Sequence, residues 1–185
     1  AHYRRQRIQD IISISERPKE AANRIIPGHW EGELIVGKNH ASAIGTLVER
    51  TKRFTLLIPL AAKDALSVSK SFAQAFKRIP SKFKKSLTYD RGMEMSQHKL
   101  FTKKTKVQVY FADPYSPWQR GTNENTNGLI RQYFPKGTDF RNVSSYEIKK
   151  AESRLNSRPR KVLDYYTPSE KFYALLTGHK IVLGI

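Results

Sequence analysis

Three acidic residues occupy positions from which their carboxylates could act together on one substrate. Glu33 lies in the first β-rich run, Asp90 ends the fourth, and Glu124 falls in the first turn of the helix expected after the fifth. They are prominent because the chain holds only 16 Asp and Glu residues against 34 Lys and Arg residues. Converging carboxylates repel one another unless cations compensate them, and hard oxygen ligands suit Mg²⁺ or Mn²⁺. The pattern therefore predicts a divalent metal centre at these three residues.

The net charge of the chain indicates the kind of substrate. Two metal ions held together can catalyse phosphoryl transfer, because they activate the attacking oxygen and stabilise the leaving one. A formal net charge of +18 implies a polyanionic partner, with nucleic acid as the leading candidate and a membrane surface as the second. No apolar run approaches the ~20 residues of a spanning helix, so we expect a cytoplasmic protein. The chain has no Cys, which excludes disulfide scaffolds and thiolate zinc sites.

The elements that must position the three carboxylates follow from the sequence pattern. Three β-rich runs over 30–37, 43–51 and 53–61 predict an antiparallel meander. The chain then predicts a helix over 65–79 capped by Asp64, a strand over 85–90, a short helix from Ser96 to about Lys104 and a strand over 107–113. Helices over 122–134, 144–158 and 167–176 follow. This order predicts an α/β fold with a mixed five-stranded sheet flanked by helices.

The same elements predict how the acids converge. The first and fourth strands are expected to be neighbours, which places Glu33 and Asp90 side by side near a common edge of the sheet. The helix over 122–134 has a polar side that carries Glu124 and an apolar side that carries Ile130 and Phe134. We expect the polar side to offer Glu124 to the same ligand.

Three segments make the sequence resemble a known family. They are PGHWEGELIVGKNHASAIGTLVERT from position 27, LTYDRGMEM from 87 and DPYSPWQRGTNENTNGLIRQYFPKGTDF from 113. Together they closely resemble the catalytic domain of bacterial transposases of the insertion-sequence 30 family, within the DDE group of transposases and retroviral-type integrases. The resemblance runs from about Ser15 to Phe172, and the 34 positions from Asp90 to Glu124 match the family's spacing.

The resemblance implies an RNase H-like fold and a DNA transposase activity. Asp90 and Glu124 would be the second and third acids, and metal-activated water would cut at the transposon end before the freed 3′-hydroxyl attacks target DNA. The implied partners are double-stranded DNA at transposon ends and target, and further copies of the chain, at the bacterial nucleoid. A helix-turn-helix region normally precedes such a domain; since the chain starts at Ala1 without Met, we expect a further N-terminal domain. We expect an arm over 1–27, the catalytic domain over 28–176 and a tail over 177–185.

Glu33 departs from the family pattern, and this departure leaves two alternatives to an active transposase. The family's motif would read WEGD, whereas this chain reads WEGE. An added methylene moves the carboxylate by roughly 1.5 Å, and misplacement by about 1 Å can cost on the order of 10²-fold in rate. The alternatives are a catalytically impaired DNA-binding module and a metal-dependent nuclease that cuts without joining. Taken singly, Glu33 is also compatible with an ordinary strand residue, Asp90 with a turn and Glu124 with a helix-dipole contact.

Basic residues flank the predicted site on both sides. Residues 77–106 carry 10 Lys and Arg against two acids, and residues 120–161 carry 10 against four. Such density suits binding to a phosphate backbone with little reading of sequence. The residues predicted to contact DNA lie beside the acids, and Trp118 would do so by stacking on a base. They are Arg91, Trp118, Arg120, Asn123, Asn127, Arg131 and Lys136.

Overall fold

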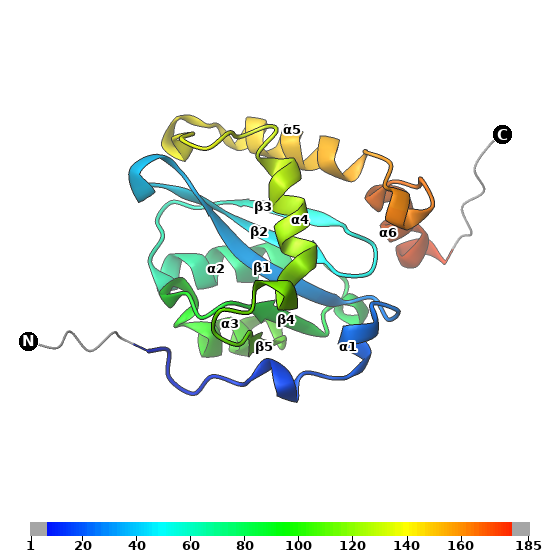
Figure 1. Cartoon of the computed structure of the whole chain (residues 1–185), viewed down its shortest axis with the longest axis horizontal. Helices are drawn as coiled ribbons and strands as arrows, with labels where there is room; N and C mark the ends of the chain where they lie inside the picture. The colour runs from blue at the N-terminus through cyan, green and yellow to red at the C-terminus, as the bar shows by residue number, and fades with distance from the viewer. Residues whose placement is uncertain (1–6, 179–185) are drawn as a thin grey trace, which may run out of the picture.

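The computed structural model describes residues 7–178, whose five strands form one mixed sheet (Figure 1). Strands β1 (His29–Val36), β2 (Ala43–Glu49) and β3 (Thr55–Pro59) form the predicted antiparallel meander. Strands β4 (Ser86–Tyr89) and β5 (Gln108–Phe111) continue the sheet beyond β1 in parallel orientation, which gives the order β3-β2-β1-β4-β5. The prediction that the first and fourth strands are neighbours is therefore confirmed.

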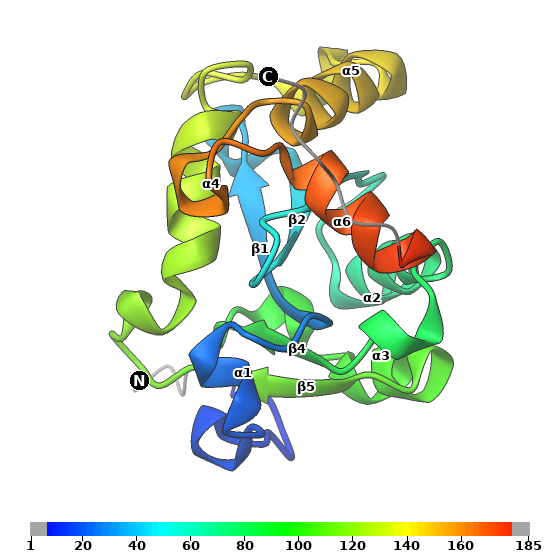
Figure 2. The ribbon, with the colours of Figure 1, turned by 90° about the vertical axis from the view of Figure 1, so that its right-hand side faces the viewer.

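Helices cover both faces of the sheet, as Figure 2 shows from the side. Helices α2 (Ala65–Phe76) and α3 (His98–Thr105) pack on one face, where Phe72, Phe76 and Phe101 are fully buried. Helices α4 (Gly121–Ile130) and α5 (Ser145–Asn156) pack on the other face, where Ile130 and Leu155 are fully buried. Helix α6 (Pro168–Thr177) adds Phe172 to the first core. Over residues 7–178, no helix combines the length and apolarity that crossing a bilayer requires.

Side-chain caps set the start of three helices where the sequence predicts them. The Asp64 side chain accepts a hydrogen bond from the Ser67 backbone N–H at 2.9 Å and begins α2. Capping boxes begin α5 and α6, in which a Ser or Thr and the Glu three residues later bond each other's backbone N–H. Helix α3 differs, because residues 93–95 form a 3₁₀ turn that ends at Ser96, so the helix begins two residues later than predicted.

The described part of the predicted N-terminal arm lies along β5 (Figure 1). Phe111 donates its backbone N–H to the Ile12 carbonyl at 2.8 Å, and the Arg17 guanidinium donates to the Thr88 hydroxyl at 2.8 Å. The arm contains a 3₁₀ turn over 14–16 and the short helix α1 (Glu20–Asn23). A domain boundary at residue 28 stays a prediction. The first six residues of the arm, and residues 179–185 of the predicted tail, lie outside the described residues.

Helix α5 closes the free edge of β3. The Asn156 amide accepts from the Thr55 N–H at 2.9 Å and donates to the Thr55 carbonyl at 2.7 Å. The Glu152 carboxylate accepts from the Leu57 N–H at 2.8 Å, and Pro59 has no N–H to offer. An open strand edge is a template for pairing with another chain, so these contacts protect the sheet.

We expect Asn156→Ala to lower the free energy of unfolding by about 1–3 kcal/mol. The variant leaves the Thr55 N–H and carbonyl without partners where both residues are buried. Urea unfolding followed by circular dichroism measures the loss. Asn125→Ala, at an exposed amide on α4, is the matched control and should change stability by less than about 0.5 kcal/mol. Equal losses in the two variants would show that the edge contacts contribute nothing.

Candidate active site

The sheet brings Glu33 and Asp90 together through a shared arginine. Glu31 of β1 is aligned with Thr88 of β4, so Glu33 and Asp90, two residues further along each chain, reach the same end of these parallel strands. The Arg120 guanidinium lies between them, with Nη1 3.2 Å from Glu33 Oε2 and Nη2 3.4 Å from Asp90 Oδ2. Arg120 is itself buried, at 8% exposure. One cation therefore compensates two of the three predicted carboxylates.

The surroundings of Glu33 oppose its negative charge. Burial raises the pKa of the Glu33 carboxyl above its usual value of 4.5, and repulsion from Asp90 adds to this, whereas Arg120 and the Asn127 amide act in the opposite direction. Asn127 Nδ2 donates to Glu33 Oε2 at 2.8 Å. An additional cation beside such a buried carboxylate would stabilise its charged form.

A further carboxylate, Glu94, stands close to Asp90. Burial raises the pKa of Glu94, and the charge of Asp90 also raises it. Its Oε1 accepts a hydrogen bond from the Tyr89 hydroxyl at 3.3 Å. The Tyr89 ring in turn covers Gly32, where an added Cβ would lie only 2.9 Å from it, so the glycine between Glu31 and Glu33 makes room for this ring. Sequence reasoning did not select Glu94, although it lies in the same motif as Asp90.

Glu124 is the one predicted ligand that stands apart. Its side chain is exposed in the first turn of α4 and has no hydrogen bond or ion pair with any residue of 7–178. Within that range, no three His, Cys, Asp or Glu side chains are gathered closely enough to hold a metal ion. Asn127, which does contact Glu33, lies three residues further along α4, and residues at this spacing are neighbours on a helix. The convergence of all three carboxylates stays a prediction.

One unsatisfied oxygen bears on whether a metal ion fits this site. Asn127 Oδ1 is buried and has no hydrogen-bond partner within the described chain. A buried polar atom without a partner is costly, and an oxygen next to Glu33 is the kind of atom that a hard cation or its bound water would satisfy. Like the carboxylate oxygens of Glu33, Asp90 and Glu124, it is a hard oxygen donor. Hard oxygen donors suit cations such as Mg²⁺ or Mn²⁺ better than zinc.

Glu31 and Asn123 fix the start of α4 against the sheet. Glu31 is fully buried; its Oε1 accepts from Arg50 Nε at 2.8 Å and its Oε2 accepts from the Asn123 backbone N–H at 2.8 Å. The Asn123 side chain is also fully buried and accepts from the Thr46 hydroxyl at 3.2 Å. These contacts determine where Glu124 and Asn127 lie relative to Glu33. Sequence reasoning had placed Asn123 toward DNA, but its side chain faces the sheet here.

The other predicted DNA contacts divide into two groups. Trp118, 70% exposed, and Lys136 are on the surface, as is Arg91, although its Nε donates to the Ala112 carbonyl at 3.1 Å. Arg131 is only partly exposed, and its guanidinium donates to the Val36 carbonyl at 2.9 Å. Arg120, Asn123 and Asn127 also make internal contacts. Contact of any of these residues with DNA stays a prediction.

Comparison with known proteins connects this geometry with a family. The integrase core domain family matches residues 24–117. The chain is 51% identical over 157 residues to the transposase InsI for insertion sequence element IS30A of Escherichia coli K12, and 47% identical over 175 residues to the transposase for insertion sequence element IS1086 of Cupriavidus metallidurans. These alignments cover 85% and 95% of this chain but only 41% and 52% of the relatives. The resemblance predicted from the motifs is confirmed.

A solved structure supports the fold independently. The catalytic core domain of BIV integrase superposes with a TM-score of 0.60 over 83% of this chain and 99% of that domain. At 18% sequence identity this likeness concerns the fold alone, and it confirms the predicted RNase H-like architecture. The family match and the shared fold lead to one conclusion: the chain belongs to the integrase core domain family.

Proposed function

We propose that this chain is the catalytic domain of a DDE-type DNA transposase, which cuts DNA strands at transposon ends and joins them to target DNA. The observation that carries the proposal is the placement of Glu33 and Asp90 about one guanidinium, 3.2 and 3.4 Å from its nitrogens, with Asn127 of α4 bonded to Glu33. Relatives of 51% and 47% identity are named transposases. The chain spans about half the length of these relatives, so the activity of the whole protein belongs to the proposal.

The proposed cofactor is Mg²⁺ or Mn²⁺, held by Glu33, Asp90 and Glu124. When bound, such ions activate the attacking oxygen and stabilise the leaving oxygen of a phosphodiester. Residues of the chain would orient the metal-binding carboxylates and bind the DNA. Asn127 orients the Glu33 carboxylate through its 2.8 Å hydrogen bond, and exposed residues beside the site hold the DNA strand. The residues proposed for contact with DNA are Arg91, Trp118, Lys136 and, after rearrangement of their internal contacts, Arg120, Asn123, Asn127 and Arg131.

The proposed partners are the double-stranded DNA of the transposon ends and target, and further copies of this chain, in the bacterial cytoplasm at the nucleoid. The test combines a fluorescent end duplex, a target plasmid and the protein, with Mg²⁺, Mn²⁺ or EDTA. We expect cleaved and joined products with either metal ion and neither product with EDTA. Cleavage without joined product would favour the nuclease alternative. Binding of the duplex without either product would favour the impaired DNA-binding module.

Arg120 offers a test of the site that does not depend on activity. Without metal, Arg120→Gln leaves Glu33 and Asp90 uncompensated, and we expect the free energy of unfolding to fall by about 1–3 kcal/mol, since these carboxylates are partly exposed. Mn²⁺ should raise the melting temperature more in the variant than in the wild type, because the ion neutralises the same two carboxylates. Differential scanning fluorimetry with and without Mn²⁺ measures both effects.

Arg154→Gln, at an exposed arginine on α5, serves as the control for the Arg120 variant. Its melting temperature should respond to Mn²⁺ as the wild type does. If Mn²⁺ raised the melting temperature equally in all three proteins, Arg120 would not compensate the carboxylates that bind the ion.

A further inference from the structure

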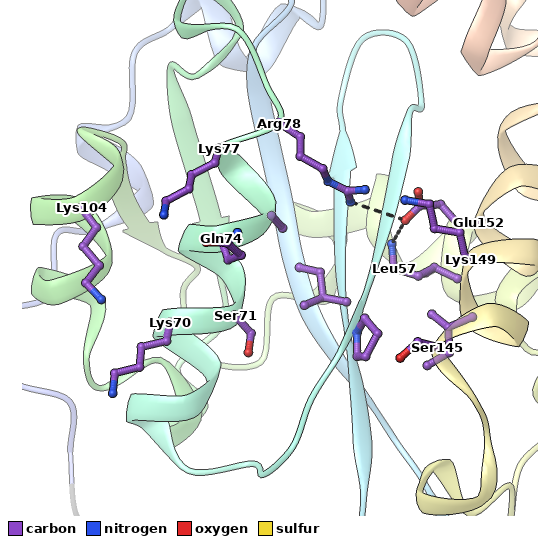
Figure 3. Close-up of a pocket in the computed structure, with 14 residues that line it drawn as sticks. Leu57, Lys70, Ser71, Gln74, Lys77, Arg78, Lys104, Ser145, Lys149 and Glu152 are labelled. Carbon is purple, nitrogen blue, oxygen red and sulfur yellow. Dashed lines mark hydrogen bonds and ion pairs between the residues drawn. The ribbon is translucent and has the colours of Figure 1, made fainter.

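A groove runs along the β3 edge of the sheet, on the far side of β2 from the strand that carries Glu33 (Figure 3). Its floor is formed by Leu57, Ile58 and Pro59 of β3, and its walls are formed by α2 and α5. The cavity volume is about 760 Å³. We call this feature the β3 groove. None of the three predicted catalytic carboxylates lines it.

The β3 groove carries a strong positive charge that nothing in the described chain neutralises. Four exposed lysines line it, and their side chains have no hydrogen bond or ion pair with any other residue between 7 and 178. Figure 3 shows them on both walls, three on the side of α2 and α3 and one on α5. The only acidic lining residue, Glu152, already accepts the Leu57 N–H at 2.8 Å and lies 4.0 Å from Arg78. The four lysines are Lys70, Lys77, Lys104 and Lys149.

Neutral hydrogen-bonding groups lie between these lysines. Ser71 and Gln74 of α2 face the groove from one wall, and Ser145 of α5 lies on the other (Figure 3). Hydroxyl and amide groups between cationic side chains are the usual contacts to the phosphate oxygens of a nucleic acid. The groove therefore combines the two kinds of group that bind a phosphate backbone.

Two other kinds of occupant fit the β3 groove poorly. A peptide that added a strand to β3 would need free N–H groups, but those of Thr55 and Leu57 are taken by α5 and Pro59 has none. A second copy of this chain docked groove to groove would place four lysines against four lysines, and like charges facing one another are strongly unfavourable. An extended polyanion meets neither difficulty.

We infer that the β3 groove binds the phosphate backbone of a DNA segment, separately from the strand held at the carboxylates. The inference of an anionic ligand rests on the unpaired lysines alone. Its identification as DNA rests on the proposed function, because a transposase must hold more than one DNA segment in order to join them. Contact through lysines predicts binding that depends steeply on salt and little on base sequence.

The test replaces the four lysines together with Ala and measures binding of a short fluorescent duplex by anisotropy, in EDTA, over a series of salt concentrations. Each lost phosphate contact lowers the slope of log affinity against log salt by about 0.9, so we expect the slope to fall by roughly 3 to 4. Affinity at moderate salt should fall on the order of 10- to 100-fold. The control replaces four exposed lysines outside the groove, Lys19, Lys38, Lys85 and Lys161, and removes the same net charge.

Each outcome decides the inference. The inference is supported if the salt dependence of binding and the affinity both fall more in the groove variant than in the control variant. Equal losses would show only a general effect of charge and would overturn it. Unchanged DNA binding also overturns it, and an altered sedimentation coefficient of the variant would then make the groove a contact between copies. Because binding is measured in EDTA, the result is independent of strand cleavage, and Glu124→Gln tests the proposed catalysis separately without touching the groove.

Discussion

Asp90→Asn and Glu124→Gln should each reduce metal-dependent strand cleavage by at least about 10³-fold. Each variant keeps the size of the side chain but removes a negative charge that would hold the cation. The cation contributes several kcal/mol of transition-state stabilisation, and each 1.36 kcal/mol corresponds to a tenfold change in rate. Asp90→Asn should fold normally, since an amide oxygen can still accept the 2.9 Å hydrogen bond from the Gly92 N–H. Initial rates on a fluorescent duplex with Mn²⁺ measure the effect.

The control for these two variants is Asp164→Asn, at an exposed position with positive φ that Asn tolerates well. It should cleave at the wild-type rate. Retained cleavage by Glu124→Gln would contradict the predicted set of three carboxylates. In that event Glu94→Gln becomes the decisive variant, because Glu94 is the other carboxylate that lies close to Asp90. Loss of cleavage in Glu94→Gln alone would identify Glu94 as the third acid.

Glu33→Asp should raise the rate of strand cleavage about 10- to 100-fold over the wild type. The shorter side chain would draw the carboxylate back by roughly 1.5 Å, toward the place that the family's Asp occupies. The shorter side chain also reaches less far toward Arg120 and Asn127, whose hydrogen bonds to Oε2 now fix the position of the carboxylate. Cleavage rates with Mn²⁺, measured beside duplex binding by anisotropy, separate catalysis from binding.

Glu31→Asp is the contrasting variant for the change at Glu33. Glu31 lies on the same side of β1 but is committed to Arg50 and to the Asn123 N–H, so shortening it should lower stability and leave cleavage no faster. If neither the wild type nor Glu33→Asp cleaves DNA while both bind it, the impaired DNA-binding module becomes the better account of this chain.

The sequence by itself determined the five strands, the five longer helices, their order and the pairing of β1 with β4. The β-rich runs, the caps at Asp64 and Thr167 and the family motifs are local signals, because strand alternation and capping depend on residues a few positions apart. Since parallel neighbours end at one edge of a sheet, these signals were also sufficient to bring Glu33 and Asp90 together. The closeness of these two acids needed no knowledge of side-chain packing.

Only the tertiary structure decided which side chains share a site. Hydrophobic periodicity assigned the buried side of α4 to its apolar residues, yet Thr122, Asn123 and Thr126 are also buried. Each has a hydrogen-bond partner: Thr122 accepts from Arg53, Asn123 accepts from Thr46, and Thr126 donates to the Thr122 carbonyl. The same holds for Arg120 between two acids and for the β3 groove, whose lysines come from α2, α3 and α5. Charged residues that are distant in the chain become neighbours only when the sheet and its helices pack together. Local sequence patterns contain no information about such long-range contacts.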